Sequence, residues 1–343
     1  MGKLWLYFVR TYISIGLFFY YRKIIVKHQE NIPKAIPILL VSNHNNALID
    51  PLLIATKSGR FSYFLTRAAV FKKPIISKFL HSLHMLPVYR IRDGWSTISN
   101  NKSIFSKCSH LLKKNNAIVL FPEGSHNIKR MVRPLSKGFT RIVFETLEMY
   151  PDIDLKIVPV GLNYEKGAEF YDSVSMYCGK PIAANDYLEF NENERVLKLK
   201  QDVIQSISKL TTDINKEGYT ETLKKLEDLN SDFLNPDEVN NCIASNFTDC
   251  KKSSKTKRNY FQLFFSGLFV LSFCVPVLIW RFLIKPKIDE IEFVATIRFV
   301  IAITLAPLWL LFITILLMVL FSFSIGIYYL IAVLIITLLA VKL

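Results

Sequence analysis

A histidine and an aspartate follow a short apolar run in the sequence SNHNNALIDP, residues 42–51. A neutral imidazole can remove a proton near pH 7, and a carboxylate on its other nitrogen fixes the tautomer, so His44 and Asp50 are candidates for a general base and its orienting partner. Residues six apart lie roughly 240° apart around an ideal helix, so the two side chains can meet only if the chain between them folds back. Pro51 favours such a turn, because it disfavours helical geometry at Asp50. The same proline leaves a second interpretation open, in which Asp50 only caps a helix that begins at Pro51.

A second group of candidates lies in FPEGS, residues 121–125, which again ends an apolar run. Ligands of α/β proteins collect at strand ends, and Glu123-Gly124 combines a carboxylate with a glycine that lets a substrate approach the backbone closely. We take Glu123 and Gly124 as candidate substrate-binding residues, together with the neighbouring Ser125 and with Asn43 of the first motif. A Pro-Glu-Gly turn is common, so this motif by itself is weak evidence.

Basic residues follow the predicted strand ends and could hold an anionic substrate. Arg67 ends the apolar run 62–67, and a guanidinium there could bind a phosphate with two hydrogen bonds. We discount nucleic acid as a partner, because no recognition motif is present and the chain carries its own hydrophobic anchor. The remaining basic candidates for anionic headgroups or acidic carriers are Lys72, Lys73, Arg90, Arg92, Lys129, Arg130, Arg133, Lys137 and Arg141.

Several other chemistries find no support in the sequence. There is no GxSxG nucleophile elbow, no Walker loop and no GxGxxG fingerprint. His81 and His84 lie on an apolar stretch without nearby acidic ligands, so we expect no metal site. His126 is either an ordinary loop residue or a substrate contact. The cysteines are odd in number and lack a CxxC pair, which indicates neither a disulfide framework nor a zinc ribbon and favours a reducing compartment; they are Cys108, Cys178, Cys242, Cys250 and Cys274.

The elements that must position these residues alternate along the chain. Short apolar runs bounded by turn residues predict strands, and stretches of helical spacing between them predict helices, so we expect an α/β fold with a mixed, mainly parallel sheet flanked by helices. We place this domain at residues 31–190. The predicted strands are 37–42, 62–67, 117–121, 156–164 and 175–182, and the predicted helices are 74–86, 99–114 and 136–149.

The hydrophobic residues concentrate near the C-terminus. The chain of 343 residues has a net charge of +15 and 51% hydrophobic residues, which excludes a disordered chain and argues for a membrane partner. Because about 20 apolar residues cross a bilayer, we expect a transmembrane region at 259–343 with about three spans, at 260–283, 299–321 and 324–341. Ser322–Gly326 is the natural place for a hairpin between the last two spans.

Two further segments complete the predicted membrane arrangement. Residues 1–30 are apolar and aromatic but contain Arg10, which predicts a membrane-associated N-terminal helix, with a buried core helix as the alternative. Residues 191–258 predict a peripheral helical segment that ends in the basic run KKSSKTKR, residues 251–258. By the positive-inside tendency this run faces the cytoplasm, so we expect an integral membrane protein with its catalytic domain on the cytoplasmic side.

The order of the motifs resembles that of the glycerolipid acyltransferase superfamily, which includes glycerol-3-phosphate and 1-acylglycerol-3-phosphate (lysophosphatidate) acyltransferases. The resemblance covers roughly residues 30–185, with NIP at 31–33, PVYR at 87–90 and GKPI at 179–182 as further points of similarity. Five residues separate His44 from Asp50 where the common pattern has four, as in a subgroup with an extended motif. Thr66 and the residues after FLTR depart from the common second motif, so the resemblance says little about the acceptor. The motifs are NHNNALID (43–50), FLTR (64–67), FPEG (121–124) and VPVGLNY (158–164).

The resemblance implies an O-acyltransferase of phospholipid biosynthesis. His44 would remove a proton from the acceptor hydroxyl, Asp50 would orient the imidazole, and Arg67 would hold the acceptor phosphate beside Glu123 and Gly124. The acyl donor would be acyl-CoA or acyl-carrier protein as a co-substrate, with no further cofactor. The acceptor would be lysophosphatidate or glycerol 3-phosphate, with another lyso-lipid such as a lyso-aminolipid as an alternative. A non-catalytic lipid-binding protein and a lipid hydrolase are the remaining alternatives.

Overall fold

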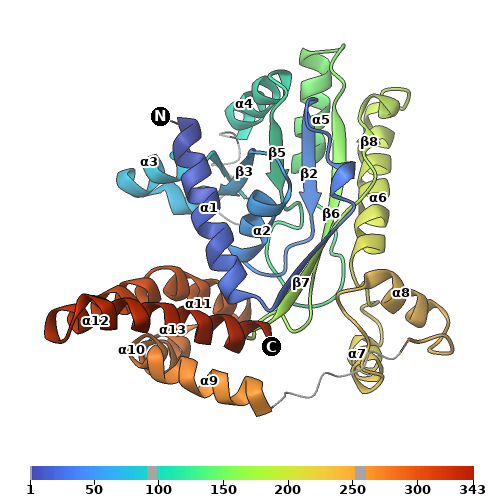
Figure 1. The fold of residues 1–343 in the computed structure, drawn as a ribbon. Coiled ribbons are helices and arrows are strands. Elements are labelled where there is room, and N and C mark those ends of the chain that lie inside the picture. Colours follow the sequence, from blue (N-terminus) through green and yellow to red (C-terminus); the bar gives the residue numbers. More distant parts are fainter. Residues whose placement is uncertain (1, 91–98, 100, 252–259) are drawn as a thin grey trace.

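The computed structural model describes residues 2–90, 99, 101–251 and 260–343, and its centre is a twisted sheet (Figure 1). The strand order is β1-β7-β6-β2-β5-β3-β4, and β8 also pairs with β6. All pairings are parallel except those of β6 with β7 and with β8. The predicted mixed, mainly parallel sheet is therefore confirmed. Its strands are β1 (Lys23–Lys27), β2 (Ile38–Ser42), β3 (Ser62–Arg67), β4 (Met85–Val88), β5 (Ala117–Leu120), β6 (Lys156–Tyr164), β7 (Ser173–Cys178) and β8 (Ile182–Ala183).

Helices cover both faces of this sheet. Alternate side chains of β2 enter two separate cores: Leu40 packs in the core that includes residues of α1 and α2, and Leu39 packs in the core under α4, α5 and α6. Burial on both faces explains why β2 reads as an unbroken apolar run. The helices here are α1 (Gly2–Tyr20), α2 (Ile49–Lys57), α3 (Pro74–Ser82), α4 (Asn101–Lys113), α5 (Gly138–Met149), α6 (Glu192–Leu210), α7 (Tyr219–Asp228) and α8 (Pro236–Ala244).

Two edge strands were not predicted from the sequence. β1 pairs with β7, so the sheet begins upstream of residue 31, where we placed the start of the domain. β4 occupies the end of the stretch 74–86 that we predicted to be helical, because α3 stops at Ser82 and His84 adopts a left-handed conformation with φ of 61°. Both strands are short and lie at sheet edges, where a proline such as Pro87 is tolerated and the apolar pattern is weak.

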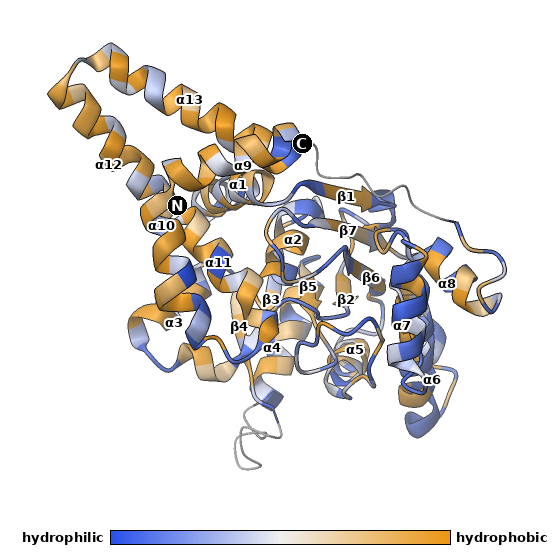
Figure 2. Ribbon diagram, turned by 90° about the horizontal axis from the view of Figure 1, so that it is seen from below, coloured by the Kyte–Doolittle hydropathy of each residue, from blue (hydrophilic) through white to orange (hydrophobic). Residues whose placement is uncertain are grey.

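The C-terminal helices gather beside one end of the sheet (Figure 1), and α12 and α13 project as an apolar hairpin (Figure 2). Two helical stretches, Ile291–Leu320 and Phe323–Lys342, are long and apolar enough to cross a membrane. Ser322 caps α13, accepting a hydrogen bond from the amide of Ile325, so the turn falls at the start of the predicted hairpin segment. The helices are α9 (Tyr260–Ser272), α10 (Cys274–Leu278), α11 (Val294–Ile303), α12 (Leu305–Leu320) and α13 (Phe323–Lys342).

The first predicted span is not one straight helix. The pair Tyr260–Ser272 and Cys274–Lys287 is bent by 93°, so the described chain has two spans by length and composition, or three if this pair counts as one. Pro276 explains the bend, because it has no N–H for the carbonyl of Ser272 and its ring clashes with that carbonyl in a continuous helix. The indole Nε1 of Trp309 donates to the freed Ser272 oxygen at 3.0 Å.

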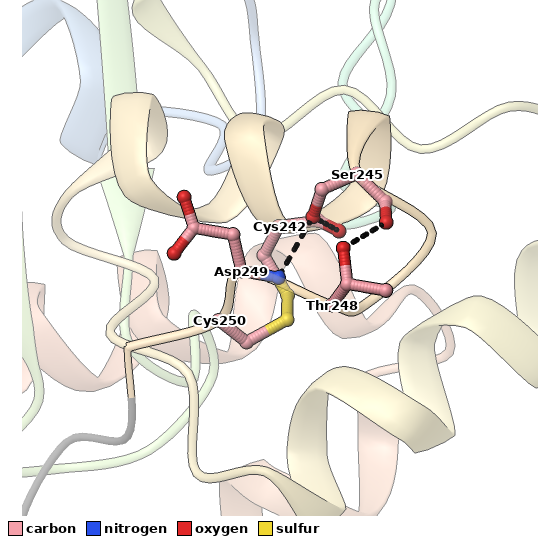
Figure 3. The surroundings of a disulfide bond; sticks show 5 residues. All are labelled: Cys242, Ser245, Thr248, Asp249 and Cys250. Atoms are coloured by element: carbon pink, nitrogen blue, oxygen red, sulfur yellow. Dashed lines mark hydrogen bonds between the residues drawn. A yellow bond between two sulfur atoms is a disulfide. The ribbon is translucent and has the colours of Figure 1, made fainter.

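A disulfide closes the turn after α8 (Figure 3), which the sequence analysis did not predict. Cys242 bonds to Cys250, while Cys108, Cys178 and Cys274 are free. The helix ends at Ala244, and the next turn reverses the chain through two left-handed residues, Asn246 and Phe247. Spacing in the sequence does not reveal this reversal. The expectation that the cysteines form no disulfide framework is therefore corrected for Cys242 and Cys250. The basic run that we expected on the cytoplasmic side falls, except for Lys251, outside the described residues.

Candidate active site

The loop between β2 and α2 brings His44 against Asp50, which is the first of the two interpretations that the sequence left open. Nδ1 of His44 lies 2.7 Å from Oδ2 of Asp50. The same carboxylate oxygen accepts hydrogen bonds from the amides of Asn45 at 2.7 Å and Asn46 at 2.8 Å. Asp50 is fully buried, and His44 keeps 15% of its side chain exposed. The carboxylate thus closes the loop between His44 and Asp50 by hydrogen bonds and holds the imidazole where it stays partly exposed to solvent.

This arrangement fixes the tautomer of His44. A carboxylate is only an acceptor, so the contact with Asp50 requires the proton on Nδ1. Nε2 then carries the lone pair, which is what a general base at neutral pH needs. The ring is stacked on Phe121 with centroids 4.2 Å apart and meets the edge of His126 at 5.6 Å. Apolar and aromatic packing therefore restricts the imidazole to one orientation.

Asp50 does not cap a helix that begins at Pro51. The helix α2 begins at Ile49, so Asp50 is already helical, and its carboxylate bonds the upstream amides of Asn45 and Asn46. Pro51 is tolerated there because the first N–H groups of a helix lack intrahelical partners and its missing donor is not needed. The prediction that Asp50 stands outside the helix is corrected, while the fold-back between His44 and Asp50 is as expected.

Tyr164 supports the pair from strand β6, and the sequence analysis did not assign it this role. Its hydroxyl donates to the second carboxylate oxygen of Asp50. Burial and the negative charge of Asp50 raise the pKa of Tyr164 well above its ordinary value. The hydroxyl therefore stays protonated and remains a donor to Asp50. Tyr164 is the last residue of the VPVGLNY motif, and its place in that motif was the one feature of the sequence that could have marked it as a site residue.

The loop after β5 forms a second rigid unit. Arg133 donates from Nε to Oε2 of Glu123 at 2.8 Å and from Nη1 to Oγ of Ser125 at 2.7 Å. Burial raises the pKa of Glu123, and the charge and hydrogen bonds of Arg133 oppose that rise. Gly124 adopts a left-handed φ of 73°, and its carbonyl accepts from Arg90 at 2.7 Å. A Cβ at Gly124 would meet no heavy atom within 4 Å, so open space lies above this glycine.

Asn43 and Arg67 differ from the other candidates. The Asn43 amide donates to the Leu162 carbonyl at 2.9 Å and accepts from the Leu162 amide at 2.8 Å, so it ties the catalytic loop to β6. A structural role accounts for these contacts. Arg67 ends β3 at the same edge of the sheet, but β5 separates it from β2 and its side chain is exposed. The structure therefore brings His44, Asp50 and the loop of Glu123 together, and Arg67 lies on the second strand away from β2.

A pocket opens beside the catalytic loop. Its wall includes Asn45 from that loop, Lys129 and Arg130 from the segment after β5, and Lys166 after β6. Arg130 is engaged with the carbonyls of Tyr164 and Glu165, each at 2.7 Å. The positive charge of this wall suits an anionic group on a substrate. Sequence reasoning placed Lys129 and Arg130 in the basic cluster but did not place Lys166.

Comparisons with known proteins show which proteins the chain is similar to. Residues 23–163 match the family model described as Acyltransferase. The chloroplast 1-acyl-sn-glycerol-3-phosphate acyltransferase of Arabidopsis thaliana is 29% identical over 182 residues, which are 51% of this chain and 48% of that protein. Glycerol-3-phosphate O-acyltransferase 2 of Saccharomyces cerevisiae is 32% identical over 116 residues, which are 30% of this chain and 16% of that protein.

A solved structure also resembles the chain. The 1-acyl-sn-glycerophosphate acyltransferase of Thermotoga maritima aligns with a TM-score of 0.46 at 18% identity, over 63% of this chain and 83% of that one. The chain spans less than half the length of the two curated relatives above. Residues 23–163 match the acyltransferase family model and the relatives carry acyltransferase names, so the resemblance inferred from the motifs is confirmed.

Proposed function

We propose that this protein is a glycerolipid O-acyltransferase that moves a fatty acyl group from a thioester to the hydroxyl of a glycerol phosphate acceptor. The observation that carries the proposal is the buried Asp50 carboxylate, which holds Nδ1–H of His44 and leaves Nε2 as the base. The family match of residues 23–163 supports the reaction class. Relatives named as 1-acylglycerol-3-phosphate and glycerol-3-phosphate acyltransferases support the acceptor class.

The proposed reaction needs no covalent enzyme intermediate. Nε2 of His44 removes the proton of the acceptor hydroxyl while that oxygen attacks the thioester carbonyl. The negative charge of Asp50 stabilises the imidazolium that forms, without taking the proton. The tetrahedral intermediate then collapses, the C–S bond breaks, and the imidazolium returns its proton to the leaving thiolate. The products are an ester and a free thiol, so protons and electrons balance without a cofactor.

The substrates and location are part of the same proposal. The donor is acyl-CoA or acyl-carrier protein, and the acceptor is lysophosphatidate or glycerol 3-phosphate. The apolar helices Ile291–Leu320 and Phe323–Lys342 support integration into a membrane that also holds the lipid substrate or product. We place the catalytic domain on the cytoplasmic side, following the basic run that begins at Lys251.

Acyl transfer by the purified full chain in detergent tests the proposal. The assay uses labelled acyl-CoA or acyl-carrier protein with glycerol 3-phosphate, lysophosphatidate or a lyso-aminolipid as the acceptor. We expect product on a glycerol phosphate acceptor, and His44→Ala should lower kcat by at least about a thousandfold because the general base is lost. Wild-type turnover in that variant would contradict the assignment of His44. Absence of product with every donor and acceptor would favour a lipid-binding role.

The same assay tests Arg67 as a phosphate contact. If its guanidinium binds the acceptor phosphate, Arg67→Gln should raise the acceptor KM about tenfold or more and leave the donor KM unchanged. Equal effects on both substrates, or none, would remove Arg67 from the site and favour the basic wall around Lys129 and Lys166.

A further inference from the structure

The helix α11 directly contacts the loop between β2 and α2, which carries the His44–Asp50 pair. The backbone amide of Leu48 donates to Oγ1 of Thr296 at 3.0 Å, across 248 residues of sequence. Leu48 is the residue before α2, and its amide is one of the donors that a helix start leaves without an intrahelical partner. Thr296 is 8% exposed. A residue of the predicted transmembrane region therefore supplies the acceptor for the start of the helix that carries Asp50.

A second connection reaches the same loop through the segment after β6. Nη2 of Arg298 donates to the carbonyl of Ala168 at 2.6 Å, and Nδ2 of Asn46 donates to the adjoining Gly167 carbonyl at 3.1 Å. Asn46 is fully buried, and its backbone amide bonds Asp50. The chain of contacts runs from Arg298 through residues 167–168 to Asn46 and the catalytic carboxylate. Two neighbouring positions of α11 thus meet the loop from two directions.

The rest of the α11 segment is packed against the domain. Ala295 and Phe299 lie in the core shared with β2 and α2, and the hydroxyl of Tyr20 donates to the Ala295 carbonyl at 3.1 Å. Just upstream, the ring of Phe293 contacts the ring of His126, which in turn lies nearly perpendicular to the ring of His44. Because this packing is buried, the position of α11 is fixed relative to the catalytic loop.

We propose that Thr296 and Arg298 are positioning residues of the transferase site, so that the start of the Ile291–Leu320 helix is part of the catalytic unit and not only an anchor. This inference rests on the proposed function. Neither residue touches the reacting atoms: Thr296 holds the Leu48 amide, and Arg298 holds the loop that binds Asn46. Their loss should let the His44–Asp50 loop move, which lowers kcat and leaves substrate binding nearly unchanged.

The test compares Thr296→Val with Thr296→Ser and Thr314→Val in the full chain. Valine keeps the shape of threonine but removes the acceptor, whereas serine keeps the acceptor. Thr314 is a matched control, because it is buried on the same apolar stretch and, within the described part of the chain, its hydroxyl donates to the Leu310 carbonyl of its own helix. We expect Thr296→Val to lower kcat about tenfold with KM within twofold, and Thr296→Ser and Thr314→Val to behave like wild type.

Hydrogen exchange provides a readout that does not depend on activity. The amide of Leu48 should exchange at least about tenfold faster in Thr296→Val, while peptides from β5 and β6 stay protected. Arg298→Gln should speed exchange in the peptide around Asn46 in the same way. Unchanged exchange and unchanged kcat in Thr296→Val would overturn the inference. A third outcome separates the two proposals. If the variants exchange faster than wild type but the wild-type protein transfers no acyl group, the proposed function is refuted and the structural coupling of Thr296 to the loop still holds.

Discussion

At the residue scale, the site depends on hydrogen bonds that saturate Asp50. Its carboxylate meets His44, two backbone amides and the Tyr164 hydroxyl, so each of its oxygens has at least one donor. A buried charge with fewer hydrogen-bond donors is costly, so loss of a donor would weaken the arrangement that holds the imidazole. The geometry of His44 therefore depends on a tyrosine from a different strand as much as on its neighbours in sequence.

Tyr164→Phe tests this dependence. Removal of the hydroxyl leaves one carboxylate oxygen of Asp50 without its tyrosine donor, so we expect kcat to fall about tenfold, by the roughly 1.5 kcal/mol of a hydrogen bond to a charged group, with KM unchanged. Tyr21→Phe is the control, because among the described residues the buried Tyr21 hydroxyl has no hydrogen-bond partner. That variant should keep full activity. Equal losses in the two variants would show that only packing matters at Tyr164.

At the element scale, a broken helix is held by a tryptophan from its neighbour. Pro276 lies four residues after Ser272 and cannot bond its carbonyl, and Trp309 of α12 supplies the donor. In a hydrocarbon environment an unpaired carbonyl is costly, so a helix break there needs a partner of this kind. The bend between α9 and α10 and the packing of α12 are consequently coupled.

Trp309→Phe should destabilise the helical region by about 1–3 kcal/mol, because the Ser272 carbonyl loses its donor. The measurement is thermal unfolding in detergent. Pro276→Ala in the same background restores an N–H at the position that a continuous helix uses, so we expect it to recover part of the loss. An unchanged Tm in Trp309→Phe would show that water or lipid satisfies this carbonyl.

At the scale of the whole molecule, the reactivity of the cysteines shows whether the protein is folded and whether its compartment is reducing. Cys108 and Cys178 are fully buried, and burial raises the pKa of each thiol to about 12. Thiolate is the reactive form, so these two should resist alkylation at pH 8 in the folded protein. The disulfide between Cys242 and Cys250 lies in the segment that we place on the cytoplasmic side, where thiols are normally reduced.

Intact-mass analysis after alkylation checks this arrangement. Protein unfolded without reductant should gain three labels, on the free thiols Cys108, Cys178 and Cys274, and reduction should add two more. The folded protein should gain none at Cys108 and Cys178. Five labels before reduction would contradict the disulfide, whereas three labels would count against the cytoplasmic placement of this segment.

The sequence by itself determined the fold class and the apolar helices at the C-terminus, and it marked His44 and Asp50 as a candidate pair with helix capping as the alternative. These follow from local signals: strand and helix periodicity, motif spacing, and uncharged runs of membrane length. Asn43 as a tether to Leu162, Arg133 as the partner of Glu123, and Tyr164 as a donor to Asp50 were decided only by the tertiary structure. So was the contact of Thr296 with Leu48. Each of these joins residues from different elements, and a hydrogen bond between distant segments leaves no periodic trace in the sequence, because its geometry exists only once the sheet has formed.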